Sequence, residues 1–337
     1  MKYARLGRSN LKVSRVCLGT MHFGGRATED ESFRIMDRAL ELGVNFFDTA
    51  NVYGVYGDVG YRGLSEEIIG HWLKARPGAR DKIVLASKVY GAMDDPPLPN
   101  QEGGISAFKV RRHLADSLKR LQTDHLDLYQ VHHLDRTISL EEFWTTFGNL
   151  VDRGEVLYIG TSNFTGWGLA KFQSAAWHRG QVGIVSEQSM YSLLCRYPEL
   201  EVLPAALDLG IGVIPYMPLA GGLLSGKRNP DPTSRTQDVS QEYGVSLGQQ
   251  NEQLAAFSRL CRELGESETV VAIAWTLANP TITSPIVGVR TVAQLDGLDR
   301  AAELVLPVDF LAKLNAVFEI NKGRPLRSGP APEAYAW

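Results

Sequence analysis

Short apolar runs that are rich in β-branched residues recur along the chain, and longer segments with helical spacing separate them. Runs of this length and composition are typical of buried β-strands. Most neighbouring runs lie roughly 30 residues apart, which is about the length of one strand–helix unit. The pattern predicts eight strands, namely Arg15–Gly19, Val44–Asp48, Ile83–Lys88, Leu126–His132, Val156–Gly160, Gly183–Gln188, Gly212–Tyr216 and Ser284–Gly288.

The segments between these runs carry apolar residues at the three- and four-residue intervals of an amphipathic helix. The spacing predicts helices over Glu31–Leu42, Lys109–Leu121, Leu140–Val151, Leu169–Trp177 and Val292–Leu304. Because parallel strands need crossover helices to cover them, the alternation predicts an α/β fold, a (β/α)8 TIM barrel. The alternative is a doubly wound sheet, but that fold rarely contains eight units and its G-x-G-x-x-G fingerprint is absent.

The whole chain, residues 1–337, is expected to form this one barrel domain, because no internal linker divides it. Residues 1–14 have the pattern of a β-hairpin that could cap the bottom of the barrel. Long polar or proline-rich segments follow the third and seventh strands, at residues 91–106 and 227–248. They leave the C-terminal ends of the strands, which is the face on which barrel active sites are built.

Composition and charge exclude several classes of partner. The chain carries 35 basic and 38 acidic residues, a net charge of −3, so it has no basic excess with which to bind nucleic acid. Its apolar runs are much shorter than the ~20 residues of a membrane span, and its first residues lack the apolar stretch of a secretory signal. The three cysteines have no zinc-site spacing, so no metal is expected. We expect a cytoplasmic protein.

Four ionisable side chains stand at or just after the ends of the second, third and fourth strands: Asp48, Tyr53, Lys88 and His132. Because these strands are neighbours in the barrel, the four side chains should converge. A tyrosine, with a pKa of ~10, is a weak acid at neutral pH, and a nearby ammonium lowers that value. A carboxylate can keep the lysine charged, and a histidine can hold a substrate oxygen. Taken singly, each residue also has an ordinary alternative: a cap, a surface tyrosine or a core histidine.

Longer stretches around these residues closely resemble the aldo-keto reductases, in the branch of bacterial enzymes related to potassium-channel β-subunits, including actinomycete homologues. The resemblance covers nearly the whole chain in order. It is carried by Asn45–Tyr53, Ser87-Lys88, Asp127–His132, Gly160–Phe164, Gln188, Tyr216–Lys227 and Pro285–Gln294.

The resemblance implies a catalytic tetrad of Asp48, Tyr53, Lys88 and His132. Tyr53 would donate the proton, Lys88 would lower its pKa, Asp48 would hold Lys88, and His132 would orient the carbonyl. The neighbouring His133 continues the predicted strand, so its side chain is expected to point the opposite way. This is the reason for preferring His132 as the catalytic histidine.

The resemblance also implies a cofactor, NADPH or NADP+, lying extended across the barrel top. Ser162, Asn163 and Gln188 would bind its carboxamide, and Tyr216 would stack on the nicotinamide. The other matching positions are Gly19, Thr20, Met21, Asp48, Met217, Pro218, Leu219, Gly221, Leu223, Lys227, Arg235, Gly288, Arg290 and Gln294. The chain departs from the family pattern in two places: Gly297-Leu298 replaces the usual Glu-Asn, and Met217 replaces the usual Ser.

The implied activity is NADPH-dependent reduction of an aldehyde or ketone to the alcohol. Polar residues expected near the mouth favour a keto-sugar, including a nucleotide-linked one, or a small polar carbonyl: Asp94, Asp95, Asn100, His133, Asp135 and Arg136. Tyr335 and Trp337 of the C-terminal tail are expected to fold over the pocket. One alternative is a redox-sensing regulatory subunit that binds NADPH but turns over little. Another is a Schiff-base aldolase that uses Lys88 as its nucleophile.

Overall fold

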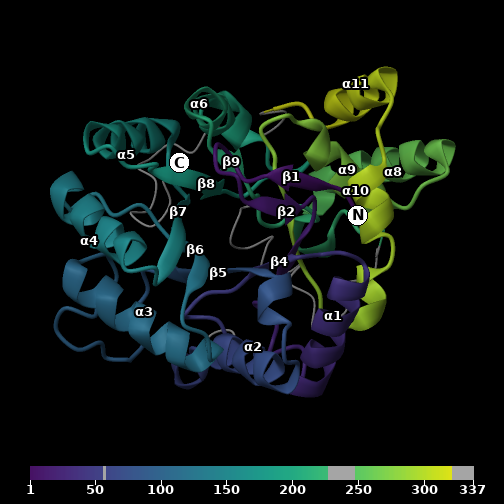
Figure 1. The fold of residues 1–337 in the computed structure, drawn as a ribbon. Helices are drawn as coiled ribbons and strands as arrows, with labels where there is room; N and C mark the ends of the chain where they lie inside the picture. The colour runs from purple at the N-terminus through teal and green to yellow at the C-terminus, as the bar shows by residue number, and fades with distance from the viewer. Residues whose placement is uncertain (56–57, 227–246, 321–337) are drawn as a thin grey trace.

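The structure, a computed structural model, describes residues 1–55, 58–226 and 247–320. In this part of the chain, eight parallel strands form one sheet in the spatial order β10-β3-β4-β5-β6-β7-β8-β9 (Figure 1). The strands are β3 (Cys17–Gly19), β4 (Phe46–Asp48), β5 (Val84–Val89), β6 (Leu126–Val131), β7 (Val156–Ser162), β8 (Ile184–Gln188), β9 (Gly212–Val213) and β10 (Ile286–Gly288).

The two outermost strands of that order also meet. Val213 in β9 bridges to Ile282, and Tyr216 bridges to Ile286 at the start of β10. These parallel bridges close the sheet on itself, which confirms the predicted eight-stranded barrel. Each predicted strand coincides with one of the observed strands, although several observed strands are shorter.

Helices form a ring around the strands (Figure 1). The α-helices of the described residues are α1 (Glu29–Glu41), α2 (Leu64–Ala75), α3 (Ala107–Leu121), α4 (Leu140–Asp152), α5 (Gly166–His178), α6 (Val202–Leu209), α8 (Leu247–Leu264), α9 (Glu268–Ala278), α10 (Leu298–Glu303) and α11 (Val308–Val317). Short 3-10 helices are η1 (Val59–Tyr61), η2 (Arg80–Lys82), η3 (Tyr197–Leu200), η4 (Ala220–Gly222) and η5 (Val292–Leu295).

Many of the long helices have an N-cap residue with a side-chain hydroxyl. Thr28, Ser106, Ser139, Thr165 and Ser267 each accept a hydrogen bond from a backbone N–H in the first turn of the helix that follows. These caps satisfy donors that have no partner inside the helix, so the sequence itself fixes where α1, α3, α4, α5 and α9 begin.

The predicted helix over Val292–Leu304 is wrong as a single element. The chain forms η5 over Val292–Leu295, breaks, and resumes as α10 at Leu298. Gly297 lies at the break with φ +83°, a left-handed conformation that a continuous α-helix excludes. The apolar periodicity was correct on both sides, but it gave no sign of this break.

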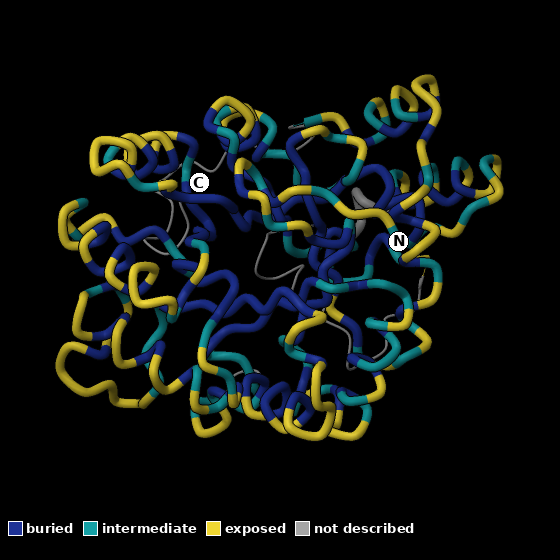
Figure 2. Tube along the Cα trace, in the orientation of Figure 1, coloured by how far each residue is buried: buried dark blue, intermediate teal, exposed yellow. Residues whose placement is uncertain are grey.

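Two groups of buried apolar side chains stabilise the barrel. The larger lies between the strands and the surrounding helices, and it includes Leu85, Tyr129 and Phe147. The smaller fills the barrel interior, with Phe46 from β4, Ala86 from β5 and other inward-facing residues. Figure 2 shows the result: the strands and inner helix faces are buried, and the outer helix faces are exposed.

The predicted N-terminal hairpin is confirmed as β1 (Tyr3–Arg5) paired antiparallel with β2 (Lys12–Ser14). Leu6 and Val13 are fully buried and pack with the apolar residues of the barrel interior, so the hairpin closes this end of the barrel. Gly7 permits the close approach: it has φ +56°, and a Cβ there would lie 2.4 Å from the carbonyl oxygen of Val185.

The described residues include no helix that combines the length and the apolar composition of a membrane span.

Candidate active site

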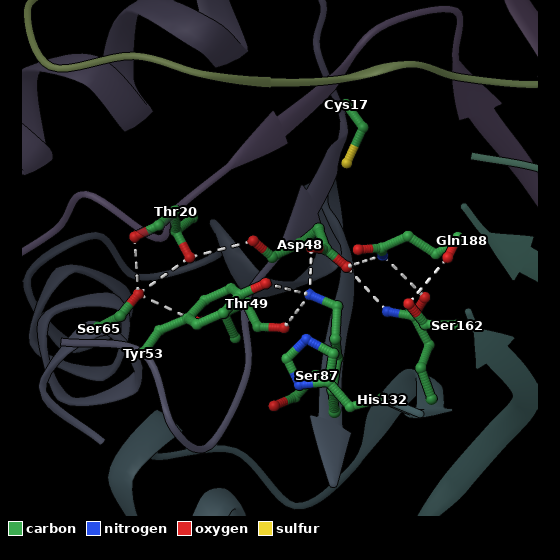
Figure 3. A network of polar contacts seen from close by, with 12 residues as sticks. Cys17, Thr20, Asp48, Thr49, Tyr53, Ser65, Ser87, His132, Ser162 and Gln188 are labelled. Atoms are coloured by element: carbon green, nitrogen blue, oxygen red, sulfur yellow. Dashed lines mark hydrogen bonds and ion pairs between the residues drawn. The ribbon is translucent and has the colours of Figure 1, made fainter. Parts of the chain in front are cut away.

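The ends of β4 and β5 bring Asp48 and Lys88 together, as the sequence predicts. Lys88 Nζ lies 2.5 Å from Asp48 Oδ2, and both side chains are almost completely removed from solvent. Figure 3 shows Asp48 at the centre of this network of polar contacts, with Tyr53, His132 and Gln188 around it. The parallel register pairs Asp48 with Ala86, so Lys88 lies one inward-facing position further along β5. This places a buried ion pair at the C-terminal face of the barrel.

Lys88 uses all three of its N–H donors. Besides Asp48, the ammonium donates to the carbonyl oxygen of Thr49 at 2.9 Å and to the phenol oxygen of Tyr53 at 3.1 Å. Burial alone would lower the pKa of Lys88, but the negative charges of Asp48 and ionised Tyr53 and the hydrogen bonds to both residues raise it above its ordinary value. A Schiff-base nucleophile must be a neutral amine, so this arrangement argues against the aldolase alternative.

Tyr53 is fixed by its backbone as well as by Lys88. Its carbonyl oxygen accepts hydrogen bonds from Gly63 N at 3.1 Å and from Ser65 N at 3.2 Å, at the start of α2. Lys88 Nζ also lies 4.6 Å from the centre of the Tyr53 ring. The phenol is therefore held beside the ammonium even though Tyr53 belongs to the loop that follows β4.

His132 completes the predicted group. Its ring lies edge-on to the Tyr53 ring, with 5.8 Å between the centroids and 77° between the planes. Desolvation lowers the pKa of His132 well below its ordinary value, and the positive charges of Lys88 and His133 lower it further. The imidazole is therefore neutral near pH 7, so its ring can donate a hydrogen bond to a carbonyl oxygen without carrying a charge.

The expectation that His133 points away from His132 is wrong. The two rings are stacked, with centroids 5.0 Å apart and planes 12° apart, and His133 also contacts Tyr90 edge-on at 5.1 Å. The reason is that β6 ends at Val131, one residue earlier than predicted. Beyond the strand end the alternation of side chains no longer applies, so both histidines belong to the same site.

Asp48 has a second set of partners, one of which sequence reasoning missed. Its Oδ1 accepts hydrogen bonds from Gln130 Nε2 at 2.8 Å and from Gln188 Nε2 at 3.0 Å. Gln188 was predicted at the site, but Gln130 was not. Gln130 is fully buried and lies on β6, two residues after the inward-facing Leu128. A glutamine at an inward position of a buried strand was the signal available.

A β-bulge decides which way β8 presents its last residues. Ile159 pairs with Ile184, whereas the next residue, Gly160, pairs with Ser186, so Val185 is an extra residue in β8. The bulge shifts the alternation by one position. As a result Gln188 reaches Asp48, while Glu187 bonds to Thr161 on the other side of the sheet.

The turn after β7 is built on Asn163, which has the left-handed φ of +58°. Asn163 Nδ2 donates to the carbonyl oxygen of His132 at 3.0 Å, and Asn163 Oδ1 accepts from the hydroxyl of Tyr216 at 2.9 Å. Ser162 Oγ donates to the carbonyl oxygen of Gln188 at 2.8 Å. The predicted carboxamide-binding residues and the predicted stacking ring therefore lie together, next to the tetrad.

Glu187 supports this turn from behind and was also missed by sequence reasoning. Its fully buried carboxylate accepts hydrogen bonds from Thr161 Oγ1 at 2.5 Å, Ser189 Oγ at 2.7 Å and Phe164 N at 3.2 Å. Burial raises the pKa of Glu187 to about 7, although these hydrogen bonds act in the opposite direction.

The remaining predicted cofactor residues fall into three groups. At the end of β3, Gly19, Thr20 and Met21 lie beside the tetrad, but Thr20 is buried and donates to the backbone oxygen of Asp48 at 3.1 Å. Thr20 therefore supports Asp48 from within the protein. Ser65 Oγ reinforces it by donating to Thr20 at 2.9 Å.

The second group is the segment after β9, which turns repeatedly in the left-handed region. Met217, Ala220, Gly221 and Gly222 have φ of 58°, 48°, 67° and 106°. This segment contains the predicted Met217, Pro218, Leu219, Gly221 and Leu223. Lys227 and Arg235 lie outside the described residues, as do Tyr335 and Trp337.

The third group follows β10. Gly288 ends the strand, and Gln294 Oε1 accepts a hydrogen bond from Arg290 N at 2.7 Å. Gln294 therefore shapes the loop that carries Arg290. Glu31 Oε1 accepts from Val292 N at 2.9 Å and ties the same loop to α1.

Asp135, one of the polar residues expected near the mouth, binds backbone groups there. It is buried, and its oxygens accept hydrogen bonds from Ile105 N at 2.7 Å and from Thr137 N at 2.8 Å. It joins the end of the loop that follows β5 to the loop that follows β6. The hydrogen bonds to its carboxylate hold these two loops together at the mouth of the barrel.

Comparisons with known proteins agree with this geometry. The sequence profile of the aldo/keto reductase family matches residues 15–319. The chain is 49% identical to the uncharacterized oxidoreductase YrpG of Bacillus subtilis, over all of both chains. It is 33% identical to versiconal hemiacetal acetate reductase of Aspergillus parasiticus, over 88% of this chain and 91% of that one. It is also 29% identical to a probable voltage-gated potassium channel subunit beta of Arabidopsis thaliana, over 99% and 100%.

Proposed function

Because the chain belongs to the aldo/keto reductase family, we propose that it reduces an aldehyde or ketone to the alcohol with NADPH as cofactor and Tyr53 as proton donor. The observation that carries the proposal is the hydrogen bond of 3.1 Å from Lys88 Nζ to the Tyr53 hydroxyl. Membership of the family and the oxidoreductase relatives support carbonyl reduction in general; the cofactor and the proton donor are the proposed detail.

The proton transfer follows from how the donors of Lys88 are used. Lys88 donates to Tyr53, so the phenol oxygen accepts there and its own O–H proton is directed elsewhere. A substrate carbonyl oxygen beside Tyr53 would receive that proton. The ammonium then stabilises the phenolate that remains, and Asp48 holds the ammonium in place through the whole step.

His132 would hold the carbonyl oxygen while its charge develops. The neutral imidazole lies against Tyr53, so a single substrate oxygen can be placed near both groups. Donors fixed at the position of a developing alkoxide are an effective source of catalysis because they need no rearrangement during the reaction.

The residues around the tetrad fit a nicotinamide cofactor. The Oε1 atom of Gln188 accepts no hydrogen bond within the described residues, which leaves it available to a carboxamide. The backbone at Gly222 and Gly288 is not crowded by the protein, since a Cβ at either position would meet other atoms only at ordinary van der Waals distances, 3.5 Å or more. The carboxamide would be held by Gln188, Ser162 and Asn163. Tyr216 would stack on the nicotinamide ring, and residues 217–223 would run along the pyrophosphate. When bound, NADPH supplies the hydride.

For the substrate we favour a keto-sugar or a small polar carbonyl. His133 and Tyr90 are half-buried beside the tetrad and can offer hydrogen bonds to substrate hydroxyls. Asp94, Asp95 and Asn100 are exposed on the loop that follows β5. A polar mouth of this kind favours substrates that carry several hydroxyl groups, because an apolar ketone would leave the polar side chains of the protein without hydrogen-bond partners.

One second candidate function has an observation in its favour. The likeness to a probable potassium channel subunit beta extends over nearly the whole chain, which suits a regulatory subunit that binds NADPH and turns over little. The complete tetrad favours the enzyme, since a sensor needs no activated proton donor.

The test is NADPH and NADH oxidation by the wild-type chain against a panel of aldehydes, ketones, keto-sugars and bulky apolar ketones. We expect turnover with NADPH, with kcat/KM highest for polyhydroxylated or small polar carbonyls. Tight NADPH binding without turnover on any carbonyl would favour the regulatory subunit. A preference for bulky apolar ketones over every sugar would contradict the proposed substrate class.

A further inference from the structure

Two buried amides connect the tetrad to the predicted carboxamide site. Gln130 Nε2 donates to Asp48 Oδ1 at 2.8 Å, and Gln188 Nε2 donates to the same oxygen at 3.0 Å. Gln188 Nε2 also donates to Gln130 Oε1 at 3.0 Å. Gln130, Gln188 and Asp48 therefore form a closed triangle of hydrogen bonds on strands β6, β8 and β4.

The triangle permits only one orientation of each amide. Asp48, paired with the ammonium of Lys88, is a carboxylate and can only accept hydrogen bonds. The nitrogen of Gln130 must therefore face Asp48, which turns its oxygen toward Gln188. Gln188 then faces two acceptors, Asp48 Oδ1 and Gln130 Oε1, and both of its N–H bonds are used.

What remains of Gln188 is its oxygen, which is an acceptor. A nicotinamide carboxamide carries one group that an acceptor can recognise, the NH2 group. If Gln188 were turned over, it would instead offer a donor, and it would suit the carboxamide oxygen. The orientation of Gln188 thus determines which half of the carboxamide the site reads.

We propose that Gln130 is a positioning residue that, together with Asp48, holds the Gln188 amide in one orientation, so that the site recognises the NH2 group of the cofactor carboxamide. The inference deepens the proposed function and depends on it, because it assumes a nicotinamide cofactor next to Gln188. Through Asp48, the same two amides join the carboxamide site to the ion pair that holds Tyr53.

The surroundings of Gln130 are shaped to keep it in place. Gly160 lies beside it on β7, and a Cβ at Gly160 would lie 3.0 Å from Gln130 Cγ and 2.4 Å from Ser186 Oγ. A side chain at position 160 would therefore crowd the Ser186 hydroxyl and the stem of Gln130. The glycine provides a second way of disturbing the triangle without changing any member of it.

The chain also contains a matched control. Gln173, on α5, is fully buried like Gln130. Among the described residues its amide bonds only to the backbone: it donates to the carbonyl oxygen of Val182 at 2.9 Å and accepts from Ile184 N at 2.8 Å. Gln173→Met should therefore report the general cost of replacing a buried amide. Methionine has a similar unbranched stem, which limits the change in packing.

The experiment compares two cofactors that differ at the proposed contact. NADP+ carries the carboxamide, whereas its 3-acetylpyridine analogue keeps the carbonyl and replaces NH2 with a methyl group. Dissociation constants are measured by titration calorimetry for wild type, Gln130→Met, Gly160→Ala and Gln173→Met. We expect wild type and Gln173→Met to bind NADP+ about 5–10-fold more tightly than the analogue, as one hydrogen bond allows.

In Gln130→Met and Gly160→Ala the ratio should fall to about twofold or less, since Gln188 Nε2 then keeps one acceptor, Asp48 Oδ1, instead of two, and the amide oxygen is no longer held on the NH2 group. A variant that binds both cofactors more weakly at an unchanged ratio would reduce Gln130 to a structural role and overturn the inference, with the proposed function intact. If Gln130→Met does not fold, the wild-type ratio still decides: equal affinity for the two cofactors overturns the inference. Failure of wild type to bind either cofactor would overturn the proposed function and the inference with it.

Discussion

Two buried carboxylates lie close together at the top of the barrel, and the protein treats them differently. Asp48 faces the barrel interior and has the ammonium of Lys88 at 2.5 Å. Glu187 faces the other side of the sheet, where its hydrogen-bond partners are the hydroxyls of Thr161 and Ser189 and the N–H of Phe164. One carboxylate is neutralised by an opposite charge, and the other is stabilised only by dipoles.

The difference shows that the two buried carboxylates have different tasks: Asp48 forms an ion pair, and Glu187 shapes a turn. Hydroxyl and amide dipoles do not fully replace water, so burial raises the pKa of Glu187 to about 7. Asp48 and Lys88 instead stabilise each other's charged forms, and the pKa of Lys88 is raised as well. The charged pair holds the Tyr53 hydroxyl through Lys88, whereas Glu187 holds the turn that carries Asn163.

The largest effect is expected from removing the cation of the charged pair. Lys88→Met leaves Asp48 buried without its partner, which should cost about 3–5 kcal/mol of unfolding free energy. It also removes the group beside Tyr53, so kcat should fall by a factor on the order of 10²–10⁴. Urea unfolding and steady-state kinetics measure the two effects.

The double variant Lys88→Met with Asp48→Asn is the control for the pair. Without the negative charge there is no buried carboxylate to leave unpaired, so stability should recover by more than half of the loss while activity stays low. If Lys88→Met alone proves as stable as wild type, Asp48 is not a buried anion that depends on Lys88 for its stability.

Replacing the other carboxylate should have a smaller effect that depends on pH. The folded chain holds a proton on Glu187 up to about pH 7, whereas an ordinary glutamate loses it near 4.5. This group therefore favours folding fully below pH 4.5, and that contribution is lost as the pH rises through 7. The shift corresponds to about 3 kcal/mol at most.

Glu187→Gln should remove this dependence. The unfolding free energy of wild type should fall between pH 5 and pH 8 relative to the variant, by up to about 3 kcal/mol. Urea unfolding of both proteins at pH 5, 6, 7 and 8 gives the difference curve. A flat difference curve would mean that Glu187 does not titrate in this range and that its dipole partners suffice.

The smallest effect is expected at the far edge of the turn. Tyr216→Phe removes the hydrogen bond of 2.9 Å to Asn163 and keeps the ring. Stability should fall by about 1 kcal/mol, and NADPH affinity by about two- to tenfold. Thermal unfolding and fluorescence titration measure these changes. A loss of affinity above 100-fold would show that the hydroxyl does more than position Asn163.

The fold was largely predictable because a barrel of parallel strands leaves a simple record in the sequence. Strands buried on both faces are short and apolar, and the helices that cover them are amphipathic, so both could be recognised without tertiary information. The strand order then placed Asp48, Lys88 and His132 side by side. Their convergence was a consequence of the topology.

Local breaks in regular structure were not predictable in the same way. Gly297 splits a predicted helix whose apolar periodicity is correct on both sides. Strand β6 ends at Val131, just before His132, so the ring of His133 stacks on that of His132 and does not point the opposite way. The extra residue Val185 in β8 reverses the alternation, so that Gln188 faces inward and Glu187 outward. Each break depends on backbone geometry set by neighbouring strands, which hydrophobic spacing does not record.

We propose that Tyr53, held by Lys88, supplies the proton for carbonyl reduction. The most direct measurement compares wild type with Tyr53→Phe, using one carbonyl substrate turned over by wild type and fluorescence titration of NADPH. We expect kcat to fall by a factor on the order of 10²–10⁴ while the Kd for NADPH changes by less than about twofold. Retention of kcat in Tyr53→Phe would contradict it, because the proton would then come from another group.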